Sequence, residues 1–165
     1  MLARYRELCA KVDAFFGRAL ARHAADMRCR PGCFACCLTE PTVTGVEAAY
    51  VRATIPAEVR AGLAARPRRP GRCVALEDDG RCAIYAARPI VCRSHGLAIR
   101  MGPDVLACHL NFKARGPAAA DADCILDQTT LSTLLAAVDA EHAATTGRGA
   151  GERIDLRDAL GEPIT

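Results

Sequence analysis

Four cysteines lie within nine residues of this chain, and their density constrains the fold more than any other feature: Cys29, Cys33, Cys36 and Cys37. Ordinary core packing does not call for thiols at such a density. Cys33 and Cys36 are separated by two residues, a spacer that lets both sulfurs reach one tetrahedral metal ion at about 2.3 Å. Cys37 directly follows Cys36, and adjacent side chains are expected to diverge. We therefore predict a metal centre in which Cys36 and Cys37 serve distinct ions or distinct corners of one polynuclear cluster.

The other six cysteines are of two kinds. Four follow the first stretch at irregular spacing: Cys73, Cys82, Cys92 and Cys108. Cys9 lies on an apolar stripe of a predicted helix and is interpreted as a small buried hydrophobe. Cys124 precedes another predicted helix, in a segment without other candidate ligands. We expect Cys9 and Cys124 to be dispensable for metal binding.

Composition limits both the core and the partners. The chain has 165 residues, which is typical of one domain with a modest core. Apolar residues make up 51%, but many are alanine and tryptophan is absent. Metal crosslinks would add stability to so thin a core. The net charge of +3 is too small to indicate a nucleic-acid or membrane partner. No motif in the sequence indicates a particular protein partner.

The N-terminal residues indicate the compartment. Residues 1–26 carry charge throughout and lack the apolar region of a secretory signal. No apolar run is long enough to span a bilayer. We therefore expect a cytoplasmic protein, in which clustered thiols are more often metal ligands than disulfides. For an exported chain, a disulfide framework would be the alternative.

Apolar periodicity and capping signals predict the helices. Residues 2–26 form an amphipathic pattern with a repeat of three and four. Thr44 and Glu47 fit a capping box and predict a helix over 45–53. Pro56 is suited to open a helix that ends near residue 66. Asp127 can cap a helix over 127–145, and a last helical turn is expected over 155–160.

Turn signals predict two β-hairpins. The first joins residues 74–76 and 81–85 through the turn 77–80, and the second joins 97–100 and 105–107. With the helices, they predict a single α-rich α+β domain over residues 1–165. Its cysteine-cluster core spans 27–112, with Cys-rich loops around a metal centre.

Six arginines lie within a few residues of the clustered cysteines: Arg28, Arg30, Arg72, Arg81, Arg88 and Arg93. Thiols are mostly protonated at neutral pH, so a metal ion or nearby cations must hold them as thiolates. Each arginine is first interpreted as a surface charge, and residues 66–72 as a solvated linker. Compensation of thiolate charge is the alternative for these arginines.

The cysteine region resembles the YkgJ family of cysteine-cluster proteins, which is described as a zinc- or iron-chelating domain. The residues that carry the resemblance are the stretch 29–37, Cys73 before Leu76, the stretch 81–85, and the stretch 88–93. The resemblance implies that the metal ligands are Cys29, Cys33, Cys36, Cys37, Cys73, Cys82 and Cys92, with Cys108 close behind. It implies no reaction.

The choice of metal stays open in the sequence. All-sulfur sites suit zinc or iron–sulfur clusters. Only one short Cys-x-x-Cys pair is present, so we slightly favour an iron–sulfur cluster, with two four-cysteine zinc sites as the alternative. The spacing of Cys29, Cys33 and Cys36 also occurs in radical SAM enzymes, but the chain is too short for their barrel. His95 or His109 could complete a site of three cysteines and one histidine, although an ordinary loop histidine is the first interpretation of each.

The predicted function is metal binding by clustered thiolates, as an electron carrier, metal chelator or assembly factor. A redox or metal sensor is the alternative, and an enzyme with an open metal position comes third. Hydrolase and nucleotide-binding motifs are absent from the sequence. A nucleophilic pair of Cys92 and His95 would compete with metal ligation, so no catalytic residue is assigned.

Overall fold

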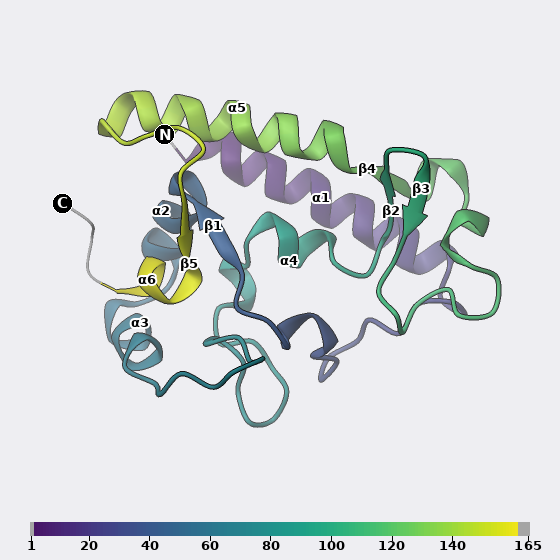
Figure 1. The fold of residues 1–165 in the computed structure, drawn as a ribbon, viewed down its shortest axis with the longest axis horizontal. Helices are drawn as coiled ribbons and strands as arrows, with labels where there is room; N and C mark the ends of the chain where they lie inside the picture. The colour runs from purple at the N-terminus through teal and green to yellow at the C-terminus, as the bar shows by residue number, and fades with distance from the viewer. Residues whose placement is uncertain (1, 162–165) are drawn as a thin grey trace.

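Two long helices run side by side along one edge of the molecule, α1 (Ala3–Arg22) and α5 (Gln128–Thr146) (Figure 1). The computed structural model describes residues 2–161. The first helix ends four residues before the expected 26, because His23 leaves the helical conformation. As predicted, Asp127 caps α5, and its carboxylate accepts a hydrogen bond from the Thr130 amide at 2.7 Å.

Three shorter helices and a two-stranded sheet occupy one end of the molecule. The helices are α2 (Gly45–Thr54), α3 (Ala57–Ala64) and α6 (Leu156–Leu160), and strands β1 (Thr42–Thr44) and β5 (Arg153–Asp155) pair antiparallel. The predicted capping box is present in α2: the Thr44 amide donates to the Glu47 carboxylate at 2.8 Å. The pairing of β1 with β5 was not predicted, because it joins segments more than 100 residues apart.

A three-stranded sheet lies at the other end, near the start of α5 (Figure 1). Its strands are β2 (Ala98–Met101), β3 (Asp104–Leu106) and β4 (Ile125–Asp127). The antiparallel pair β2–β3 confirms the second predicted hairpin. Strand β4 adds to β2 in parallel and was not predicted.

The first predicted hairpin is reduced to a tight turn. Leu76 and Cys82 form a single antiparallel bridge, and the described part of the chain has no strand at either flank. The Glu77 amide donates to the Arg81 carbonyl at 2.8 Å, and Gly80 closes the turn at a φ of 81°. Among the flanking residues, Val74, Ala75 and Ile84 pack into the core.

Helix α4 (Ile90–Ser94) is a further element that the sequence did not predict. Pro89 stands at the N-terminal cap, where its fixed φ is compatible with a helix that begins at Ile90. Shorter 3₁₀ turns cover the ranges Ala35–Cys37, Tyr85–Ala87, Pro117–Ala119 and Ala122–Cys124.

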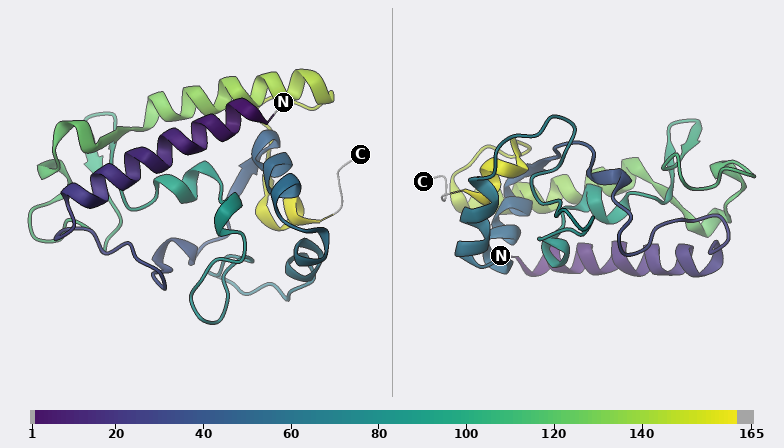
Figure 2. Two further views of the ribbon diagram at one scale, coloured as in Figure 1. Left: turned by 180° about the vertical axis from the view of Figure 1, so that it is seen from behind. Right: turned by 90° about the horizontal axis from the view of Figure 1, so that it is seen from below.

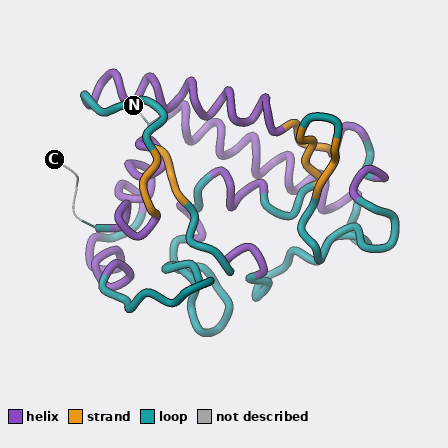
Figure 3. Tube along the Cα trace, in the orientation of Figure 1, coloured by secondary structure: helices purple, strands orange, loops and turns teal. Residues whose placement is uncertain are grey.

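Long loops gather along the edge opposite α5. From either side of the molecule, the order is α5, α1, α4 and then the loops that carry the first cysteines (Figures 1 and 2). The same loops form the lower rim of the tube in Figure 3. The apolar cluster beneath them includes Val74, Leu76 and Ile84, so the cysteine region contributes large side chains to the core. Within residues 2–161, no helix is both long and apolar enough to cross a membrane.

Candidate metal centre

The Cys36–Cys37 pair lies in the 3₁₀ turn Ala35–Cys37, on the loop edge of the molecule. The two sulfur atoms are 3.8 Å apart. The expectation that these adjacent side chains diverge is therefore wrong, because the tight turn directs both sulfurs to one place. The two thiols share a hydrogen bond in which either sulfur can be the donor. This hydrogen bond lowers the pKa of the accepting thiol and raises the pKa of the donating one, so one thiol of the pair ionises before the other.

Three later cysteines lie around this pair: Cys73, Cys82 and Cys92. Burial raises the pKa of each thiol, and the neighbouring thiols Cys36 and Cys73 raise the pKa of Cys92 further, to about 12. The Cys73 amide donates to the Cys37 carbonyl at 2.8 Å and fixes the two segments together. These five residues, Cys36, Cys37, Cys73, Cys82 and Cys92, form what we call the five-thiol group.

A second set surrounds Cys29. Burial raises the pKa of this thiol, a hydrogen bond from Asn111 opposes the rise, and the nearby thiols of Cys33 and Cys108 add to it. We call Cys29, Cys33 and Cys108 the Cys29 group. The charge of Cys36 raises the pKa of Cys29 and also that of Cys73, so the two groups are neighbours.

Asn111 holds the Cys29 group in place with its side-chain amide. Its Oδ1 accepts from the Arg28 amide at 2.7 Å, and its Nδ2 donates to the Gly96 carbonyl at 2.7 Å and to the Cys29 sulfur at 3.3 Å. The Asn111 side chain is buried. One side chain thus joins three segments that are distant in sequence.

Gly96 makes room for the Cys29 sulfur. Its φ is 102°, and a Cβ added there would lie 2.5 Å from that sulfur and 3.3 Å from the Asn111 amide nitrogen. Glycine is therefore required both by the backbone conformation and by the close approach.

The loop of the first cysteines packs against the turn before Cys82. The Cys33 amide closes a turn to the Arg30 carbonyl at 2.9 Å, with Gly32 at a φ of 85°. A Cβ added to Gly80 would lie 3.1 Å from the Phe34 ring and 3.2 Å from the Gly32 carbonyl oxygen. Two glycines thus let the two loops meet.

Two arginines anchor the five-thiol group to α1. Arg93 is buried and pairs with Asp13, and it donates to the Arg88 and Ala86 carbonyls at 2.8 and 2.9 Å. Arg88 reaches Asp13 at 3.3 Å and lies 3.9 Å from the centre of the Tyr85 ring. The positive charge of Arg88 favours the thiolate forms of Cys36 and Cys82. At Cys82 this contribution is smaller than the effect of burial, which raises the pKa.

Glu47 fixes the start of α4, the helix that carries Cys92. This buried carboxylate accepts from the Thr44 amide through one oxygen and from the Ile90 amide through the other, at 2.8 and 2.9 Å. The capping box of α2 therefore also positions α4.

The remaining candidates lie apart from these groups or at their margin. Cys9 and Cys124 are buried in separate apolar clusters, and for Cys9 this burial was expected. His95 and His109 are largely exposed. Partial burial, and then the nearby His109 ring, lower the pKa of His95. The two histidines lie next to Gly96 and Cys108, at the edge of the Cys29 group.

The donor set fits a thiophilic metal. Zinc and iron–sulfur clusters prefer thiolates, and the five-thiol group offers these within one neighbourhood. In the part of the chain that the structure describes, no three cysteine, histidine or carboxylate side chains are already arranged to hold one ion. The Cys36–Cys37 pair has a sulfur separation of 3.8 Å, which is suited to shared ligation of one metal.

Sequence reasoning missed three residues of this site: Asp13, Gly96 and Asn111. Asn111 follows Cys108 by three residues, and an amide side chain so near a candidate ligand is a signal that could have found it. Asp13 lies on α1, 75 residues or more from its partners, and nothing in the sequence links them.

Comparison with protein-family models finds one family over this region. Residues 28–118 match the CxxCxxCC family, described as a "putative zinc- or iron-chelating domain". This is the YkgJ family that the sequence resembles. The pattern in the family's name has two residues between its first two cysteines, whereas this chain has three, Arg30–Gly32, which the turn at Gly32 accommodates. No curated protein and no solved structure matches the chain. Because the match covers more than half of its residues, the chain belongs to the CxxCxxCC family of zinc- or iron-chelating domains.

Proposed function

We propose that this protein chelates thiophilic metal ions through eight cysteines in two neighbouring groups. The five-thiol group is Cys36, Cys37, Cys73, Cys82 and Cys92, and the Cys29 group is Cys29, Cys33 and Cys108. Membership of a metal-chelating family supports metal binding. The observation that carries the choice of residues is the convergence of thiols from separate segments on the Cys36–Cys37 pair.

The sulfur separation supports a tetrahedral metal that takes two thiolates of the five-thiol group. Two bonds of about 2.3 Å at a tetrahedral angle place ligand sulfurs about 3.8 Å apart, and Cys36 and Cys37 have a separation of 3.8 Å. Sequence spacing slightly favoured an iron–sulfur cluster. The same separation occurs wherever one tetrahedral metal takes two cysteines, which includes each iron of a two-iron cluster, so we propose zinc as the simplest occupant, and metal analysis distinguishes the two.

The exposure of the thiols supports reversible chelation. Seven of the eight candidate ligands are only partly buried, and Cys73 is the buried one. An ion held there lies near the surface, where partner ligands can reach it. We infer a metal chelator or carrier.

The test is metal content with an optical spectrum of protein purified without oxygen. Cys37→Ser and Cys82→Ser should lower bound metal per chain, whereas the control variant Cys124→Ala should retain it. A colourless zinc protein agrees with the proposal. Visible absorption with bound iron would replace zinc by an iron–sulfur cluster, and a metal-free wild type would overturn chelation.

A further inference from the structure

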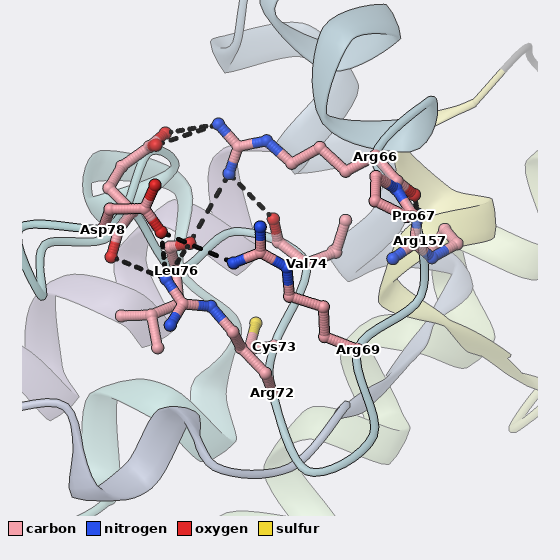
Figure 4. Close-up of a pocket in the computed structure, with 10 residues that line it drawn as sticks. Arg66, Pro67, Arg69, Arg72, Cys73, Val74, Leu76, Asp78 and Arg157 are labelled. Atoms are coloured by element: carbon pink, nitrogen blue, oxygen red, sulfur yellow. Dashed lines mark hydrogen bonds and ion pairs between the residues drawn. The ribbon is translucent and has the colours of Figure 1, made fainter.

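A cavity of about 180 Å³ lies beside the five-thiol group, and four arginines contribute to its wall (Figure 4). They are Arg66, Arg69, Arg72 and Arg157. Two carboxylates, Glu77 and Asp78, belong to the same wall, so the lining carries a net charge of +2. The volume is below that of cavities for drug-sized ligands and suits a small ion.

The four arginines differ in how many hydrogen bonds and ion pairs their guanidinium groups make within the protein. Arg66 donates to both Glu77 oxygens at 2.9 Å, and Arg157 donates to the Ala64 carbonyl at 3.0 Å. These two arginines are fixed. Among the described residues, the Nε atom of Arg157 is buried and has no hydrogen-bond partner.

Arg69 and Arg72 share one carboxylate partner. The Arg69 guanidinium makes no hydrogen bond within residues 2–161, and its one ion pair there is with Asp78 at 3.5 Å. Arg72 makes its side-chain hydrogen bonds through Nη2 alone, to the Leu76 and Glu77 carbonyls at 3.3 and 3.0 Å and to the same Asp78 oxygen at 3.0 Å (Figure 4). The Asp78 side chain is 89% exposed. An exposed carboxylate held between two guanidinium groups occupies the place that an external oxyanion would take.

We propose that this cavity binds a small oxyanion with two or more negative charges, a phosphate or a polycarboxylate, which displaces the Asp78 carboxylate from Arg69 and Arg72. The bound anion lies beside Cys73, whose side chain lines the same cavity (Figure 4). The proposal does not depend on the metal, because the binding groups are guanidinium groups.

Titration calorimetry of the full-length protein with sodium phosphate, and separately with tricarballylate, tests the proposal. Tricarballylate is a tricarboxylate without the hydroxyl group that strengthens metal chelation by citrate, so it tests the carboxylate source with little effect on bound metal. Arg69→Gln should weaken binding about tenfold, since it removes charge-assisted hydrogen bonds. Asp78→Asn should strengthen binding, because it removes the competing internal carboxylate.

Arg100→Gln is the matched control, as it removes one exposed arginine charge from β2, away from the cavity. Tighter binding of tricarballylate assigns the cavity to a polycarboxylate, and tighter binding of phosphate assigns it to a phosphate. The proposal is overturned if neither anion binds, if Asp78→Asn fails to strengthen binding, or if Arg100→Gln weakens binding as much as Arg69→Gln. Metal content of each variant is measured in parallel, so loss of metal chelation would be seen independently.

Discussion

The side-chain amide of Asn111 donates a hydrogen bond to the sulfur of Cys29 at 3.3 Å, while its oxygen holds the Arg28 amide. Donors to a ligand sulfur orient the ligand and adjust its basicity. Asn111 is therefore a positioning residue for the proposed Cys29 group. Its two other hydrogen bonds connect that group to the backbone of residues 28 and 96.

Asn111→Ala should weaken metal binding by roughly tenfold, the lower end for lost partners of metal ligands. It also leaves the Arg28 amide and the Gly96 carbonyl without partners, which should cost about 1–3 kcal/mol of unfolding free energy. Competition with a chromophoric chelator measures the first effect, and urea denaturation measures the second. Gln128→Ala is the control, because its amide donates to Ser132 on the exposed side of α5. Unchanged metal affinity in a destabilised Asn111→Ala variant would limit Asn111 to a scaffold role.

Gly96→Ala should disturb the Cys29 group more than a general backbone change would. The new Cβ would lie 2.5 Å from the Cys29 sulfur, so that sulfur must move and metal affinity should fall. Gly102→Ala is the matched comparison: its φ is 62°, and nothing lies within 4 Å of an added Cβ. We expect Gly102→Ala to cost about 1 kcal/mol of stability with metal affinity retained. Equal metal affinity in the two variants would argue against the close packing at Gly96.

Asp13→Asn should loosen the contact between α1 and the segment that carries Cys92. Arg93 is 5% exposed and would lose its carboxylate partner, as would Arg88. We expect the unfolding free energy to fall by about 2 kcal/mol, since Asp13 itself is partly solvated. The control is Glu7→Gln on the same helix, whose exposed ion pair with Lys11 should contribute much less than the Asp13 pairs. Equal losses in denaturation experiments would show that the Asp13 pairs are no stronger than surface pairs.

Tyr5 should make the protein sensitive to alkaline pH. Burial raises the pKa of the Tyr5 hydroxyl above its usual 10.0, and the proximity of Glu47 raises it further. The unfolded chain therefore loses this proton first, so the stability contributed below pH 10 is lost as the pH rises above it. In urea denaturation at successive pH values, wild type should lose up to about 1.4 kcal/mol per pH unit more than Tyr5→Phe. Parallel curves for the two proteins above pH 10 would contradict this assignment.

Local signals in the sequence accounted for most of the helical structure. The Thr44–Glu47 capping box and the Asp127 cap are present, because each depends on residues only three apart. The second oxygen of Glu47 binds the Ile90 amide across 43 residues, and no local pattern encodes that contact. Strand pairs β1–β5 and β2–β4 were missed for the same reason.

The candidate site was predictable in its ligand types and less so in its geometry. The density of cysteines in the sequence indicated that they are metal ligands. The short distance between the Cys36 and Cys37 sulfurs depends on the 3₁₀ turn that contains them. The first predicted hairpin is present as one antiparallel bridge across its turn, and Val74 and Leu76 beside that bridge pack into the core.

X-ray absorption at the metal edge, on protein purified without oxygen, tests the central claim most directly: clustered cysteines alone hold the metal. We expect a first shell of sulfur atoms, at about 2.3 Å for zinc, and the same spectrum from the Cys9→Ala/Cys124→Ala double variant. A first shell of oxygen or nitrogen atoms, or a spectrum changed by loss of Cys9 and Cys124, would contradict the account.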